Sequence, residues 1–134
     1  MTRAILAVVA GLVVWMLVAT ILNFGVRAGF AGYTAAEPTL TFTLGMKIAR
    51  LILGALASLA AGAAAGLIAP SKTGPRWVLG GIILALFIPV HIQLWAKFPV
   101  WYHLVFLGTL LPLVAMGAAL ASARVRMSPT QARA

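Results

Sequence analysis

The chain has 134 residues, of which 63% are hydrophobic and only 8% are charged, and its mean hydropathy is +1.11. Since soluble domains usually carry about a quarter charged residues, this composition excludes an ordinary soluble globule and predicts one integral membrane domain over residues 1–134. Ten basic residues against one acidic residue give a net charge of +9. The basic residues lie between and beside apolar runs, so we expect membrane lipids as partners and no nucleic acid.

Four apolar runs of about 20 residues follow one another along the chain, each long enough to cross a hydrocarbon core of about 30 Å as a helix. Their predicted bounds are 4–22, 51–69, 77–95 and 101–122. Helices satisfy their own backbone in lipid, so the fold class is predicted to be all-α, a four-helix transmembrane bundle. The first run is longer than the roughly 7–15 residues of a signal-peptide core, which favours an uncleaved span.

The link between the first two runs is the only long one. Pro38 and Thr39 can start a helix, with Thr39 as its N-cap, so the second span is predicted to carry a helical extension from about residue 39. A helix over 39–69 would be about 46 Å long and exceed the hydrocarbon core. Lys47 and Arg50 would then lie near the outer boundary of the hydrocarbon core.

Small residues recur every fourth position in the second span and share one face of its helix. They are Gly54, Ser58, Gly62 and Gly66. Small side chains let helices approach closely in lipid, so we expect this stripe to pack against another helix, either within the chain or in a second copy.

Pro89 and Pro112 fall inside the third and fourth spans. Proline removes one backbone donor and clashes with the carbonyl one turn earlier. A tolerated kink is the simpler interpretation, and a hinge or an exposed carbonyl ligand is the alternative.

Loop charges predict the orientation. With four spans, both termini and the link 70–76 share one side, whose basic residues are Arg3, Lys72, Arg76, Arg124, Arg126 and Arg133. The opposite side holds fewer basic residues, which Glu37 partly offsets. The positive-inside rule therefore favours cytoplasmic termini in a bacterial-type inner (plasma) membrane, with 123–134 as a short, disordered, basic cytoplasmic tail.

The remaining polar side chains gather at the predicted outer face. The candidate recognition site there consists of Glu37, Lys47, Arg50, His91, Trp95 and His103. His91 should lie within the apolar region and needs a polar partner. His91 and His103 reach similar depths on either side of a short turn, but helix rotation decides whether they face each other. Glu37, the only acidic residue, is expected to pair with an arginine and tie the long link over the bundle.

These features predict a small accessory or structural membrane subunit, or a lipid-interacting factor, that contacts lipids and another membrane protein or a second copy of itself. One alternative is a histidine-based haem, metal or redox protein with Glu37 as third ligand. Another is an oligomeric small transporter. A single carboxylate and the lack of aspartate argue against paired-acid and Ser-His-Asp catalysis, so no catalytic residue, metal site or cofactor is favoured.

Overall fold

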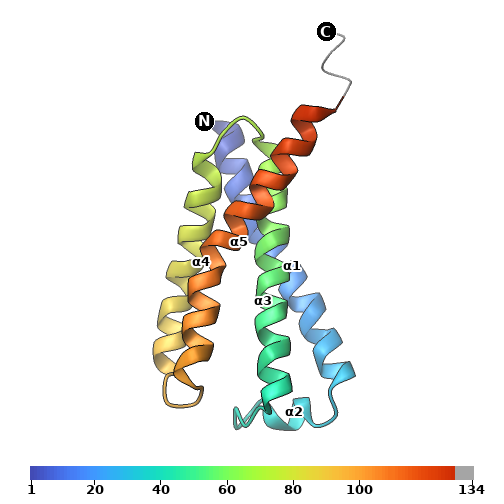
Figure 1. Cartoon of the computed structure of the whole chain (residues 1–134), viewed down its shortest axis with the longest axis vertical. Helices are drawn as coiled ribbons and strands as arrows, with labels where there is room; N and C mark the ends of the chain where they lie inside the picture. Colours follow the sequence, from blue (N-terminus) through green and yellow to red (C-terminus); the bar gives the residue numbers. More distant parts are fainter. Residues whose placement is uncertain (129–134) are drawn as a thin grey trace.

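The computed structural model describes residues 1–128, and this part of the chain is helical throughout apart from its links (Figure 1). Its helices are α1 (Thr2–Gly29), α2 (Tyr33–Ala36), α3 (Leu44–Ile68), α4 (Gly74–Gln93) and α5 (Val100–Met127). All except the short α2 are long and apolar enough to cross a membrane. The predicted all-α chain with four helices of spanning length is therefore confirmed.

Large apolar side chains cover the outside of the bundle. Leu17 of α1, Leu86 of α4 and Leu104 of α5 are each more than half exposed. A soluble monomer rarely exposes contiguous apolar surface on this scale, whereas lipid tails match it. The surface of the bundle thus suits a hydrocarbon environment.

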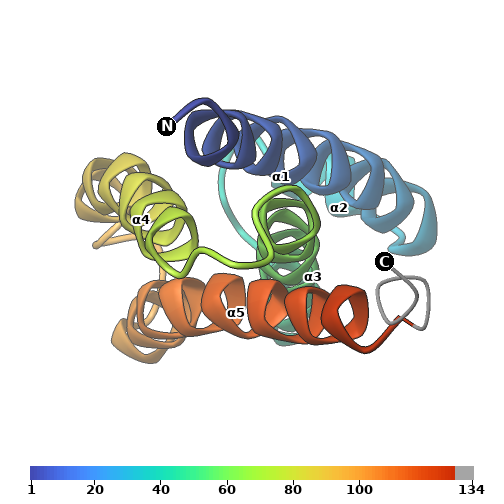
Figure 2. The same cartoon turned by 90° about the horizontal axis from the view of Figure 1, so that it is seen from above.

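The two ends of the bundle differ in what they contain. The N-terminus, the α3–α4 link and the end of α5 lie at one end, called here the terminal end (Figure 1). The α1–α3 link with α2 and the α4–α5 turn lie at the opposite end, called here the turn end. Viewed along the bundle, α3 lies between α1 and α5, and α4 completes the ring beside them (Figure 2).

The closest helix contact joins α3 to α5. A Cβ atom added to Gly62 would overlap the Val114 carbonyl, and one added to Gly66 would overlap the Ala118 carbonyl. The Ser122 hydroxyl of α5 donates to the Gly66 carbonyl at 3.2 Å. The small-residue stripe thus packs against a helix of the same chain, where two backbones touch and dispersion contacts are dense.

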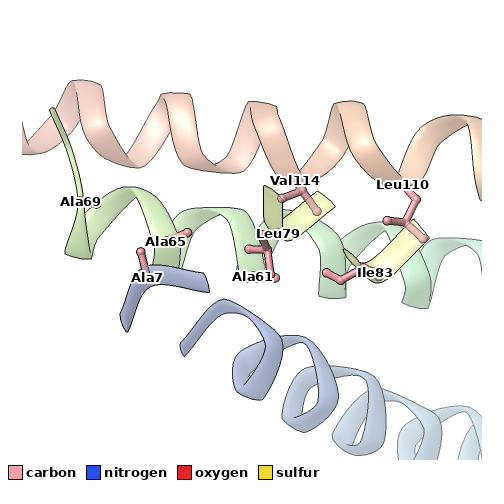
Figure 3. Packing of buried hydrophobic residues seen from close by; sticks show 8 residues of the cluster. All are labelled: Ala7, Ala61, Ala65, Ala69, Leu79, Ile83, Leu110 and Val114. Carbon is pink, nitrogen blue, oxygen red and sulfur yellow. The ribbon is translucent and has the colours of Figure 1, made fainter. Parts of the chain in front are cut away.

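Apolar side chains from all four long helices fill the interior beside this contact (Figure 3). The buried cluster consists of Ala7, Ala61, Ala65, Ala69, Leu79, Ile83, Leu110 and Val114. Farther along α3, Trp15 Nε1 of α1 donates to Ser58 Oγ at 3.2 Å, and Ser58 Oγ donates to the Gly54 carbonyl at 2.7 Å. Ser58 therefore gives the partly buried indole of α1 a hydrogen-bond partner on α3.

The second span carries the predicted helical extension, but the extension begins later than predicted. Helix α3 begins at Leu44, and its N-cap is Thr43, whose hydroxyl accepts from the Met46 amide at 3.3 Å. Thr39 instead donates to the Ala36 carbonyl at 3.4 Å. Leu40 has φ of 57°, a left-handed conformation that cannot continue a right-handed helix. The segment between α2 and α3 is therefore a turn.

The predicted boundary of the basic tail is also wrong, because α5 continues to Met127. Arg124 and Arg126 lie in its last turn, where basic side chains interact favourably with the helix dipole. Arg126 Nε donates to the Ser122 carbonyl at 3.3 Å. The rest of the predicted tail, 129–134 with Arg133, lies outside the described residues.

Neither internal proline ends its helix, since α4 runs through Pro89 and α5 through Pro112. This continuity agrees with proline tolerated inside a membrane helix. The kink or hinge at each position stays a prediction.

Replacing Gly62 with alanine should destabilise the bundle, because the new methyl group overlaps the Val114 carbonyl. Overpacking of this kind typically costs about 1–3 kcal/mol. The midpoint of thermal unfolding in detergent should therefore fall. Gly81→Ala on α4 is the matched control, since a Cβ there meets nothing within 4 Å. An equal response of the two variants would contradict the proposed backbone contact.

Candidate functional site

Arg50 continues the small-residue face of α3 to the turn end, one helical turn before Gly54. Its Nη1 donates to Tyr33 Oη of α2 at 2.7 Å, and its Nε donates to Tyr102 Oη of α5 at 3.4 Å. The guanidinium carbon lies 4.8 Å from the centre of the Phe42 ring. Two phenol oxygens and one aromatic face thus hold a partly buried cation without any negative charge.

An aromatic layer closes the turn end around this cation. Tyr33, Phe42, Phe98 and Tyr102 are all buried, together with Met46. The rings of Phe98 and Tyr102 stack at 4.6 Å between centroids, and those of Tyr33 and Phe42 pack at 5.1 Å. This layer joins α2 and the start of α3 to the α4–α5 turn, and it fixes the position of Arg50.

The single carboxylate of the chain is occupied elsewhere. Arg27 Nη2 at the end of α1 lies 3.0 Å from Glu37 Oε2, and Arg27 Nε donates to Glu37 Oε1 at 3.2 Å. This two-pronged pair ties the end of α1 to the link that follows α2. Because Glu37 is the only acidic side chain, Arg50 has no side-chain carboxylate of its own.

A cavity of about 360 Å³ lies between the four long helices on this half of the bundle. Its lining combines one cation, several hydrogen-bonding side chains and aromatic rings. The lining residues are Trp15, Ala19, Thr20, Asn23, Glu37, Arg50, Leu53, Gly54, Phe87, Tyr102 and Phe106. The Phe106 ring packs where the Cβ of Gly54 would lie, so the glycine makes room for the aromatic wall.

The two histidines form a hydrogen-bonded pair behind this wall. His91 Nδ1 of α4 lies 2.7 Å from His103 Nδ1 of α5, and the side chains are 4% and 0% exposed. The Phe106 ring stacks on His91 at 4.7 Å, and the Trp95 ring stacks on His103 at 4.7 Å. Each histidine is thus the polar partner that the other needs in an apolar surrounding.

The surroundings of His103 indicate which of the two Nδ1 atoms carries the proton of this hydrogen bond. Of two facing Nδ1 atoms one donates and the other accepts, and the accepting ring carries its proton on Nε2. His103 Nε2 is buried and has no hydrogen-bond partner among residues 1–128. Orphaned buried N–H groups are rarer than under-satisfied acceptors. We therefore assign His103 as the donor, with a bare Nε2, and His91 as the acceptor.

Several predicted site residues come together here, and others do not. The Trp95 ring stacks on His103, and the His103 ring meets His91 edge-on. The Tyr102 ring stacks on His91, and its hydroxyl accepts from Arg50. The predicted Glu37–arginine pair is formed with Arg27. Glu37 lines the same cavity as Arg50, whereas Lys47, on the turn of α3 before Arg50, does not line it.

The candidate site predicted from the sequence did not include Tyr33, Tyr102 or Trp15. The signal available in the sequence was that the chain has only two tyrosines. Both of them turn out to hold the Arg50 guanidinium.

The predicted three-ligand metal alternative lacks its third ligand. Within residues 1–128 no three side chains of the His, Cys, Asp and Glu types lie close enough to hold a metal ion. Glu37 is bound to Arg27, so it does not join the two histidines.

No protein-family model matches the chain, and neither the curated proteins nor the solved structures contain a match to it.

The histidine pair should show strong coupling in a double-mutant cycle. Changing His91 or His103 alone to leucine leaves the other imidazole buried without its partner, which costs about 1–3 kcal/mol. The double variant removes both polar groups and should be less destabilised than the sum of the single variants. Thermal unfolding midpoints in detergent measure this coupling, and additive effects would contradict the hydrogen bond.

Proposed function

We propose that this protein is a lipid-interacting factor that binds the anionic headgroup of a membrane phospholipid in the cavity beside Arg50. The carrying observation is the Arg50 guanidinium itself, which forms part of the cavity wall and is held by two tyrosine hydroxyls with no carboxylate. A cation in an apolar surrounding is costly unless an anion or other partner offsets it. A phosphodiester headgroup supplies that anion.

The hydrogen-bonding capacity of Arg50 supports this proposal. Tyrosine hydroxyls engage Nη1 and Nε, and within the described residues Nη2 has no hydrogen-bond partner. Guanidinium groups bind phosphate oxygens through short, charge-assisted hydrogen bonds. Asn23 and Thr20 of α1, which also line the cavity, offer further polar groups to a glycerol headgroup.

The charge balance of the cavity favours an anion over a cation. Glu37 lines the cavity, but its charge is neutralised by Arg27 at 3.0 Å. Arg50 therefore leaves the lining with a net positive charge. Its position about 9 Å along α3 from the helix start, by the rise of about 1.5 Å per residue, matches the depth of a headgroup near the hydrocarbon boundary.

The proposed setting is a bacterial-type inner membrane that the four long helices cross, with both termini in the cytoplasm. The bias of basic residues toward the terminal end supports this orientation. The cavity would then open toward the outer leaflet.

Arg50→Gln should weaken binding of phosphatidylglycerol roughly 10- to 100-fold, the range expected for loss of a hydrogen-bonded charge worth about 1.5–3 kcal/mol. The affinity of Arg50→Lys should lie between those of wild type and Arg50→Gln, because an ammonium keeps the charge but cannot bind both tyrosine hydroxyls. Native mass spectrometry of lipid adducts in detergent measures these affinities.

Lys47→Gln is the matched control. It also removes one positive charge, but Lys47 lies one helical turn before Arg50 and does not line the cavity. Its affinity should equal that of wild type. Zwitterionic phosphatidylcholine should bind weakly to every variant. Competition by the water-soluble headgroup glycerophosphoglycerol separates headgroup recognition from tail binding. Equal binding of the two lipids, or loss of affinity in Lys47→Gln as large as in Arg50→Gln, would overturn the proposal.

The orientation is tested with single cysteines, since the chain has none of its own. Ala96→Cys in the exposed α4–α5 turn should react with a membrane-impermeant maleimide in intact spheroplasts. Ser71→Cys in the exposed α3–α4 link should react only after the membrane is opened. The reverse pattern would place the cavity at the cytoplasmic leaflet.

A further inference from the structure

We infer that the His91–His103 pair is a proton-binding site coupled to the cavity, so that the protein takes up a proton from water when it binds an anionic headgroup. This inference rests on the proposed function and adds a second ligand, the proton, to the same site. It predicts a phospholipid-binding protein whose affinity depends on pH.

The pair and the cavity share a wall. Phe106 and Tyr102 line the cavity and also pack on His91, with ring centroids at 4.7 and 6.0 Å. Phe87, another lining residue, meets the His91 ring edge-on at 6.5 Å. One layer of aromatic rings therefore separates the imidazoles from a bound headgroup. Such a layer excludes water, so charges on its two sides are weakly screened.

The pair has a vacant position for one more proton. His103 donates through Nδ1, and its buried Nε2 has no partner among residues 1–128. A proton added to Nε2 converts His103 to imidazolium and leaves the Nδ1–H bond to His91 in place. That bond becomes charge-assisted and therefore stronger. The new N–H at Nε2 has no partner among residues 1–128, so protonation is unfavourable until a bound anion offsets the charge.

The groups around the pair explain why the proton needs the anion. On α5 Tyr102 stacks beside His91, and Tyr102 in turn binds Arg50 of α3. Tyr33 of α2 binds the same guanidinium, and Lys97 lies exposed in the turn. None of these groups is negative at neutral pH.

On α1 the nearest charge is Arg27, which is neutralised by Glu37. An imidazolium beside the empty cavity therefore has only a cation near it, whereas a bound phosphodiester offsets both positive charges. By linkage each ligand raises the affinity of the other.

The size of the coupling follows from Coulomb's law. Two unit charges about 10 Å apart at an effective dielectric constant of about 20 alter an equilibrium by roughly tenfold to twentyfold. Phosphatidylglycerol should therefore bind more tightly at about pH 5.5 than at about pH 8, by up to roughly tenfold. Its phosphodiester stays ionised throughout, so the lipid does not cause the change.

The experiment is isothermal titration calorimetry of the detergent-solubilised full chain with short-chain phosphatidylglycerol. Titrations near pH 6 in two buffers of different ionisation enthalpy count the protons taken up per lipid, and affinities are compared at the two extreme pH values. Wild type should take up a fraction of one proton and bind phosphatidylglycerol more tightly at the lower pH. This measurement needs no variant, so a folding defect cannot obscure it.

Two variants locate the proton. His103→Gln keeps an amide that can donate to His91 but cannot accept the proton at this position, so proton uptake should disappear while binding at about pH 8 remains. Lys47→Gln changes a charged residue that does not line the cavity and should retain the uptake. Wild-type binding with no pH change and no uptake overturns the coupling and leaves the lipid site standing. Failure to bind at any pH overturns both.

Discussion

The backbones of α3 and α5 touch where Gly62 meets Val114 and Gly66 meets Ala118. On the same face of α3, going toward the turn end, the facing residues become larger, first with Phe106 against Gly54 and then with Tyr102 against Arg50. Side chains of increasing size hold two helices progressively farther apart. The contact at the terminal end therefore sets the space at the turn end, where a cavity and an aromatic layer occupy what tight packing would otherwise fill.

A second constraint is the shortage of negative charge, because the chain has ten basic side chains and only one acidic side chain. Arg27 takes Glu37 in an ion pair that fixes the long link, and this leaves Arg50 with only neutral oxygens and an aromatic face. Neutral hydroxyls satisfy a guanidinium geometrically but do not cancel its charge. The histidines solve a similar problem by pairing with each other as neutral rings. Both solutions leave room for an external anion.

Composition and run length were sufficient to predict four apolar helices, and the four-residue spacing of Gly54, Ser58, Gly62 and Gly66 predicted a close helix contact, because both patterns depend on local chain geometry. The start of α3 was not predictable in this way, since the left-handed Leu40 is imposed by the packing of the link. The contact between His91 and His103 depends on the rotation of two helices, which no spacing within one helix reveals. Tyr33 and Tyr102 were not included in the predicted site, because a tyrosine near the end of a span is typical of an interfacial aromatic belt.

The distribution of polar groups between the two halves favours binding over transport. Ala61, Ala65 and Leu79 pack the interior toward the terminal end together with other apolar side chains, and there the α3 and α5 backbones are in contact. A charged solute crossing that region would lose its hydration without gaining a partner, which is prohibitive in a low-dielectric interior. Arg50 and the histidine pair, by contrast, lie together in one half of the bundle. Under the proposed function, an anion and a proton would reach this site from one leaflet and leave by the same route.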